Sequence, residues 1–172
     1  MRGRRVLALA AVVLVAALGA VAAGAHSPVR AADIPEPSAP DKPVDPDYTA
    51  AVRAIKANQF PAAIRLLEGV VARDDENADA YNMLAYAVRK NGDPGRSIPI
   101  YQKALALEPR HRGAHEYIGE AYLALDNVAK AREHLTRLDS LCLLPCSEYL
   151  DLEKAVEAYE KSGGKVKPTS GW

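Results

Sequence analysis

The chain has 172 residues, and its 22 basic and 22 acidic side chains cancel to a formal net charge of zero. A balanced charge without a basic stripe gives no indication of binding to nucleic acid, so we expect no nucleic-acid partner. The length suffices for one small domain between two segments of unusual composition at the ends.

The N-terminal segment has the pattern of an export signal. Three arginines lie among the first five residues, residues 6–23 carry no charge and are mostly Ala, Val and Leu, and small residues follow up to Ala25. This order is typical of a secretory signal peptide over residues 1–25 with cleavage after Ala25. Together with the Ala- and Arg-rich composition, it predicts a bacterial envelope protein located in the periplasm. An uncleaved anchor is the alternative, because about 18 apolar residues reach the lower limit for spanning a bilayer. Only in that case do we expect contact with a membrane.

A proline-rich stretch follows the signal. Six prolines recur between residues 26 and 46, with polar residues between them, which predicts a disordered, extended linker. The glycine-rich end, residues 162–172, predicts a flexible tail. The folded domain is therefore expected over residues 47–161.

The middle of the chain repeats every 34 residues. Small residues, large apolar residues and turn-forming residues each return at this spacing, which predicts pairs of closely packed antiparallel helices. The matching sets are Ala51, Ala85 and Gly119; Ala63, Ser97 and Ala131; Leu67, Tyr101 and Leu135; and the turn residues Asn58, Gly92 and Asp126. The expected helices cover residues 47–57, 61–73, 78–90, 94–107, 112–124 and 128–140.

Two prolines and one aspartate refine the helix starts. Pro61 and Pro94 stand where a helix begins, a position that needs no N–H donor, and Asp93 can cap the helix that Pro94 opens. Pro99 lies inside the same predicted helix, where proline is unfavourable. Either this helix starts late, near Ser97, or it is kinked.

The repeating unit resembles the tetratricopeptide repeat (TPR). The copies cover about residues 44–77, 78–111 and 112–145, and the second is the most complete. Its matching residues are Tyr81, Leu84, Ala85, Tyr101, Ala104 and Pro109. The resemblance implies an all-α, right-handed solenoid of three helix-turn-helix repeats. Residues 147–161 then form a C-terminal capping helix, because Glu153 occupies the position where a further repeat needs a small residue.

The resemblance also implies a concave groove, lined by the first helix of each repeat, that binds a protein or peptide segment. Arg89 with two glutamates opposite it suits a peptide of mixed character; the alternative is that this face is merely exposed to solvent. The family's groove positions correspond here to Tyr48, Val52, Ile55, Asp79, Asn82, Tyr86, Arg89, Gly113, Glu116, Glu120 and Leu123.

The two cysteines, Cys142 and Cys146, lie four positions apart around Pro145. In an oxidising compartment an even cysteine count favours one disulfide, which here would brace the joint between the third repeat and the capping helix. A dithiol or soft-metal site is the alternative, although no Met or His lies near enough in sequence to be a third ligand. The stretch around the cysteines resembles the end of small exported TPR proteins of proteobacteria.

The sequence contains no nucleophile motif, no phosphate-binding loop and no metal-ligand cluster, so we expect no enzyme activity, no cofactor and no metal. His111, His115 and His134 are interpreted as structural residues. The leading hypothesis is a periplasmic, non-enzymatic TPR adaptor. The alternative is a thiol-redox or metal-handling accessory protein that uses Cys142 and Cys146.

Overall fold

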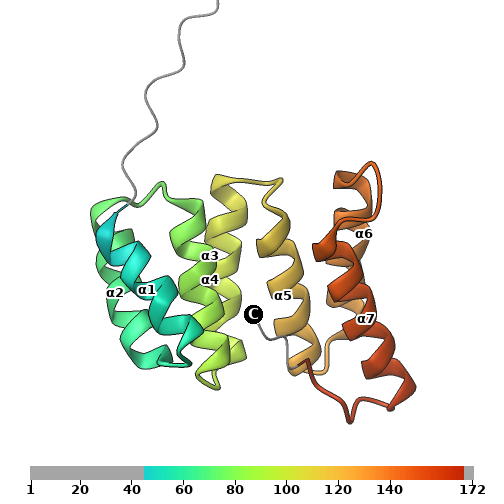
Figure 1. Ribbon diagram of the computed structural model, residues 1–172. Helices are drawn as coiled ribbons and strands as arrows, with labels where there is room; N and C mark the ends of the chain where they lie inside the picture. Colours follow the sequence, from blue (N-terminus) through green and yellow to red (C-terminus); the bar gives the residue numbers. More distant parts are fainter. Residues whose placement is uncertain (1–44, 169–172) are drawn as a thin grey trace, which may run out of the picture. The chain divides into compact units, whose positions relative to one another are not determined.

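The structure, a computed structural model, describes residues 45–168, and this part of the chain forms seven α-helices and no strand (Figure 1). The predicted signal peptide, residues 26–44 of the predicted linker and residues 169–172 lie outside the described residues. None of the described helices is long and apolar enough to cross a membrane. The helices are α1 (Pro46–Lys56), α2 (Phe60–Arg73), α3 (Ala78–Lys90), α4 (Pro94–Leu107), α5 (Arg112–Ala124), α6 (Val128–Leu141) and α7 (Ser147–Lys161). The all-α prediction is confirmed, and the expected helix ends differ from these by at most one residue.

Side chains that precede the helices explain where most of them begin. The residue before the first turn accepts a hydrogen bond from a backbone N–H that has no partner inside the helix. The predicted cap is present, since Asp93 accepts from the Arg96 amide at 2.9 Å. The other side-chain caps are Asp45 on α1, Asn77 on α3, His111 on α5 and Asn127 on α6.

The turn inside each repeat has the same backbone geometry. Asn58, Gly92 and Asp126 all have positive φ, at 56°, 97° and 60°. In each turn the amide of the next residue donates to a carbonyl five residues earlier, as in Gln59 N to Ala54 O at 2.8 Å. A left-handed residue that closes such a bond is a common helix ending. The 34-residue spacing of these turn residues therefore marks three equivalent hairpins, as predicted.

Helix α4 differs from the expectation around Pro99. The start near Ser97 is wrong, because the helix begins at Pro94 and continues through Pro99 to Leu107. Pro99 is only the sixth residue of the helix and is exposed. Its ring removes the one hydrogen bond to the carbonyl of Gly95, while the Asp93 cap and Pro94 fix the start of the helix little more than one turn before Pro99.

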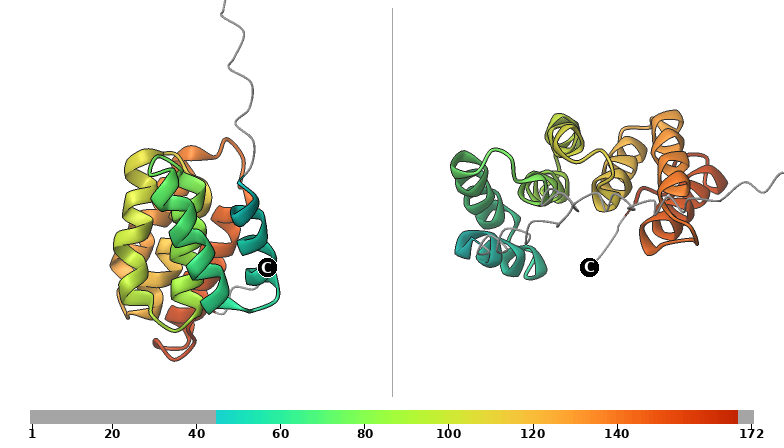
Figure 2. Two further views of the ribbon diagram at one scale, coloured as in Figure 1. Left: turned by 90° about the vertical axis from the view of Figure 1, so that its left-hand side faces the viewer. Right: turned by 90° about the horizontal axis from the view of Figure 1, so that it is seen from above.

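The helices form two rows, which the view from above shows (Figure 2). The first helices of the repeats and α7 form one row, in which α1 contacts α3, α3 contacts α5 and α5 contacts α7. The second helices, α2, α4 and α6, form the other row and contact only the first helices and α7. The small repeat residues lie where two helices meet, and five of them have no exposed surface: Ala51, Ala63, Ala85, Ser97 and Ala131.

Helix α7 covers the apolar end of the third repeat. Leu152 and Val156 pack into one cluster with Leu123 of α5 and Leu138 of α6. At Gly119 the approach is so close that a Cβ atom would lie 2.6 Å from a methyl carbon of Leu152. The predicted capping role of residues 147–161 is therefore confirmed.

The chain turns back after α7. Gly163 and Gly164 have positive φ, and the Gly164 amide donates to Tyr159 O at 2.8 Å. Lys167 then reaches the C-terminal end of α5, where its ammonium lies 3.3 Å from Leu123 O and pairs with Asp126. The described part of the tail predicted to be flexible thus makes specific contacts with the domain.

Candidate functional site: the first-helix face

The residues that the sequence assigned to a groove differ widely in exposure. We call this set, from Tyr48 to Leu123 on α1, α3 and α5, the first-helix face. Asp79 is exposed, and Tyr48, Val52 and Gly113 are half-buried. The remaining members are buried: Ile55, Asn82, Tyr86, Arg89, Glu116, Glu120 and Leu123.

Ile55 and Leu123 belong to the apolar interior. Ile55 packs in the cluster built from α1, α2 and α3, and Leu123 packs in the cluster with α6 and α7. Both are close to fully buried, at 2% and 0% exposed. Their position leaves them almost no surface to offer to a partner, which corrects the expectation that they line an open groove.

Arg89 and Glu120 join α3 to α5 through a buried ion pair. The Arg89 Nη2 and Glu120 Oε2 atoms are 2.8 Å apart, and the two side chains are 5% and 2% exposed. The guanidinium also lies over the rings of Tyr86 and Tyr117, at 5.3 and 5.9 Å from their centres. The sequence interpretation had Arg89 and Glu120 facing a bound peptide from opposite sides; the structure has them facing each other.

Glu116, one turn before Glu120 on α5, lacks such a partner. Its residue is 7% exposed, and Arg89, the cation whose charge acts on it, is paired with Glu120. Burial, reinforced by the negative charges of Glu120, Asp151 and Glu148, raises the pKa of Glu116 to about 8. The side chain therefore keeps its proton at neutral pH in the folded protein.

Asn82 of α3 presents a buried acceptor without a partner. Its Oδ1 atom is buried and accepts no hydrogen bond within the described residues. Its Nδ2 atom lies 3.5 Å from the point where a Cβ atom of Gly113 would be. Gly113 precedes Glu116 by three residues on α5, so the amide of Asn82 lies one helical turn from Glu116 along that helix.

The N-terminal end of the face contains an ion pair. His111 Nε2 lies 3.1 Å from Asp79 Oδ1, and His111 Nδ1 accepts from the Ala114 amide. The hydrogen bond with Asp79 raises the pKa of His111, and the same bond lowers the pKa of Asp79. Burial and the charge of Asp79 raise the pKa of Tyr48. His111 thus has the structural role expected for it.

The other two histidines lie away from this face, between α5 and α6. The Nδ1 atoms of His115 and His134 are 2.9 Å apart, and His115 Nε2 lies 3.1 Å from Pro109 O. This arrangement requires His115 to donate to the carbonyl and His134 to donate to His115. Burial, with His115 beside it, lowers the pKa of His134 to about 4. The sequence interpretation treated both residues as structural but missed their contact, since nothing in the repeat pattern indicates it.

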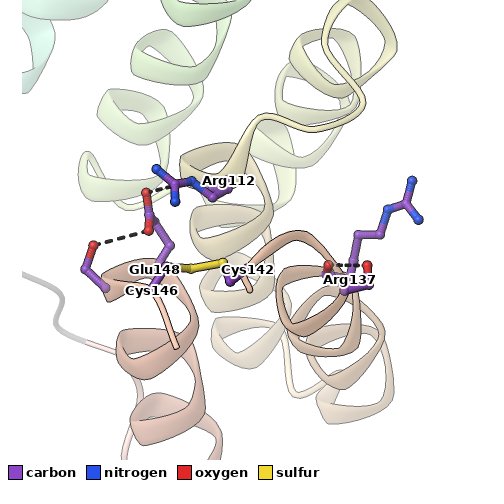
Figure 3. Close-up of a disulfide and its surroundings, with 7 residues drawn as sticks. Arg112, Arg137, Cys142, Cys146 and Glu148 are labelled. Atoms are coloured by element: carbon purple, nitrogen blue, oxygen red, sulfur yellow. Dashed lines mark hydrogen bonds and ion pairs between the residues drawn. A yellow bond between two sulfur atoms is a disulfide. The ribbon is translucent and has the colours of Figure 1, made fainter. Parts of the chain in front are cut away.

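The two cysteines form a disulfide at the joint between α6 and α7 (Figure 3). Their Cα atoms are 5.9 Å apart, and Cys142 follows the last residue of α6 while Cys146 precedes the first of α7. Beside the bridge, Arg112 Nε of α5 pairs with Glu148 Oε1 of α7 at 3.5 Å. The predicted brace is therefore present, although its five residues form a loop instead of a helical turn. The loop leaves Leu143 and Leu144 exposed.

No group of three or more His, Cys, Asp or Glu side chains in residues 45–168 is arranged to hold a metal ion. The chemistry of the first-helix face is therefore that of hydrogen bonding and charge: two ion pairs, one buried acceptor without a partner, a glutamate with a raised pKa and several aromatic rings.

A family model described as tetratricopeptide repeat matches residues 48–105 and, in a second overlapping match, residues 83–141. A structure of MamA from Desulfovibrio magneticus RS-1 superposes with a TM-score of 0.54 and 29% identity, covering 55% of this chain and 54% of that one. The type III secretion translocator chaperone SycD of Yersinia enterocolitica superposes with a TM-score of 0.59 and 15% identity, covering 67% of this chain and 87% of that one. A CopN-Scc3 complex gives a TM-score of 0.55 at 12% identity, covering 65% of each chain. This chain thus spans about half the length of the MamA structure. No curated protein sequence gives a match.

Proposed function

Because the chain belongs to the tetratricopeptide repeat family, whose members are protein-interaction modules, we propose that it is an exported adaptor that holds a segment of a partner protein against its first-helix face. The observation that carries this proposal is the combination of polar and aromatic groups on α3 and α5. A buried acceptor without a partner, such as Asn82 Oδ1, is costly in a surface that serves packing alone and suits a surface that a ligand completes. SycD is described as a chaperone of a secretion translocator, and the CopN-Scc3 structure is a complex, so this fold serves protein binding in both.

The adaptor is proposed to act without catalysis. Repeat proteins of this family are generally scaffolds, and the described residues present no nucleophile joined to a base. The alternative of thiol-redox or metal handling has no support from the family model or from the MamA structure.

Site-specific photo-cross-linking in cells tests the binding surface. The structure selects Asp79 for the probe because its side chain is 72% exposed, whereas Tyr86 and Glu120 are buried. Gln102, exposed on α4 in the opposite row, is the matched control. We expect a discrete cross-linked species from Asp79 and not from Gln102. The same species from both positions would show that the partner does not use this face.

We further propose that the chain is exported to the periplasm with residues 1–25 removed. The disulfide supports this location, because bridges of this kind persist in oxidising compartments. Fractionation followed by N-terminal sequencing should find a periplasmic protein that begins at His26. An intact N-terminus in the membrane fraction would favour the uncleaved anchor, and a reduced protein in the cytoplasm would refute export.

A further inference from the structure

We propose that Asn82 and Glu116, on the first-helix face between α3 and α5, form a binding site for one cationic side chain, lysine or arginine, of the partner segment. We call these two residues the acceptor pair. The inference rests on the proposed function and adds the chemistry of the group that the partner must present.

The first step concerns the two acceptors themselves. Asn82 and Glu116 are 5% and 7% exposed; the Asn82 Oδ1 atom has no hydrogen-bond partner within residues 45–168, and the Glu116 carboxyl group faces the negative charges of Glu120, Asp151 and Glu148. They come from different helices: the Nδ2 atom of Asn82 lies 3.5 Å from the point where a Cβ atom of Gly113 would be, beside the His111 ring, and Glu116 follows Gly113 by about one turn on α5. The unsatisfied Asn82 acceptor costs free energy that a donor would recover, and a cation beside Glu116 would balance the negative charges around it.

The second step concerns the kind of group that can satisfy both. An ammonium or a guanidinium offers three or five N–H donors and no acceptor, so it can bond to both residues at once. A bond from such a cation to a carboxylate is about twice as strong as one between neutral groups. A carboxylate from the partner has no donor for Asn82 Oδ1 and would face the negative charges of Glu120, Glu148 and Asp151.

The third step concerns the surrounding charges. The arginines nearby are engaged within the protein, Arg89 with Glu120 and Arg112 with Glu148. Asp151 on α7 is exposed and makes no ion pair in the described part of the chain, and its charge acts on Glu116. The charge of Asp151 therefore favours a cation over an anion beside Glu116.

Occupation of the site also changes the protonation of Glu116. Four charged groups face it: Glu120 from its own helix, Glu148 and Asp151 from α7, and Arg89 from α3. The first three and burial favour the protonated form, and a cation placed beside the carboxyl group favours the ionised form. Binding at neutral pH then releases one proton from Glu116 to the solvent and leaves an ion pair. Affinity for a cationic ligand should consequently increase as the pH is raised toward the pKa of about 8, by up to about tenfold per pH unit.

A peptide-selection experiment provides the main test. The purified chain is immobilised at pH 8 and offered four degenerate octapeptide pools that differ only in one fixed residue: Lys, Arg, Gln or Glu. We expect the Lys and Arg pools to be retained about tenfold more than the Gln pool, since charge-assisted bonds in buried sites have effects of this size. Glu116→Gln should reduce the preference to about twofold, and so should Asn82→Leu, a second variant that retains the side-chain volume. Glu68→Gln, at an exposed glutamate on α2, is the control that should keep the preference.

A titration with small cations separates this inference from the proposed function. Butylguanidinium and butylammonium, with butyramide as the neutral control, are added while the Asn82 side-chain amide signals are followed by NMR. Peptide retention without a cation preference, or a preference that survives in Glu116→Gln, overturns the site but leaves the adaptor function. Shifts with the cations but no retained peptide support the site and overturn the peptide-binding function. The absence of both peptide retention and NMR shifts would overturn both the site and the peptide-binding function.

Discussion

Replacing Glu116 with glutamine should change how the stability of the folded chain depends on pH. In the folded state the pKa of Glu116 is raised from 4.5 to about 8, so the native protein holds a proton there that the unfolded chain has lost at neutral pH. The contribution is fully present below the unfolded pKa and is lost as the pH rises through the folded value. Stability from this group therefore falls between about pH 4.5 and pH 8.

The size of the effect follows from the shift. Each pH unit inside this window costs about 1.4 kcal/mol for one proton, so the wild type should lose about 3 kcal/mol from this group between pH 5.5 and pH 7.5. Glu116→Gln cannot titrate and should lack this component. The free energy of unfolding, measured by urea titration with circular dichroism at several pH values, gives the difference between the two curves.

The matched control for this experiment is Glu68→Gln on α2, where the carboxylate is exposed and pairs with Arg96. Its curve should run parallel to that of the wild type. If the Glu116→Gln curve is also parallel between pH 5.5 and pH 7.5, then Glu116 ionises equally in the folded and unfolded states. That result would refute the argument from burial.

Three further predictions concern the packing of the repeats. Arg89→Met should destabilise the fold by about 3–5 kcal/mol in urea titrations because it removes the guanidinium that pairs with the buried Glu120 carboxylate. The double variant Arg89→Met/Glu120→Leu should lose less stability than Arg89→Met alone. A greater loss of stability in the double variant than in Arg89→Met would contradict the pairing. Gly119→Ala should destabilise by about 1–3 kcal/mol through overpacking against Leu152, partly offset by better helix propensity, and Leu152→Val should remove the penalty. Thermal melts of the wild type, the two single variants and the double variant test this, and an equal effect of Gly119→Ala in both backgrounds would exclude the clash. Reduction of the disulfide between Cys142 and Cys146 should lower the free energy of unfolding by about 2 kcal/mol, the value expected for so short a loop. A change near zero would show that the bridge does not restrict the unfolded chain.

The repeat architecture could be predicted from the sequence because each hairpin depends on residues that act locally. Asn58, Gly92 and Asp126 each end a first helix through their own backbone conformation, and their spacing alone reveals three equivalent turns. The start of α4 was harder, since Pro99 suggested a late start whereas the Asp93 cap determines the observed one.

The face of the first helices could be located in the same way but its chemistry could not. Arg89 and Glu120 are 31 positions apart, and the ion pair between them depends on how α3 packs against α5. A sequence pattern gives the helix face of each residue but not which charges meet across two helices. The contact of His115 with His134 was missed for the same reason.

The linear order of helix contacts also affects how the molecule opens. The hairpin α1–α2 contacts the rest of the helices only through α3, whereas α3, α4 and α5 each have packed neighbours on two sides. In such arrays stability is the sum of each repeat and its interfaces, so the ends exchange their amide hydrogens sooner than the centre. Amides of α1 and α2 should therefore exchange through separate opening of that hairpin, while those of α3 and α5 wait for global unfolding. The buried ion pair lies in this slowest unit, so the chain presents its polar centre on its most rigid part and leaves its first repeat able to adjust.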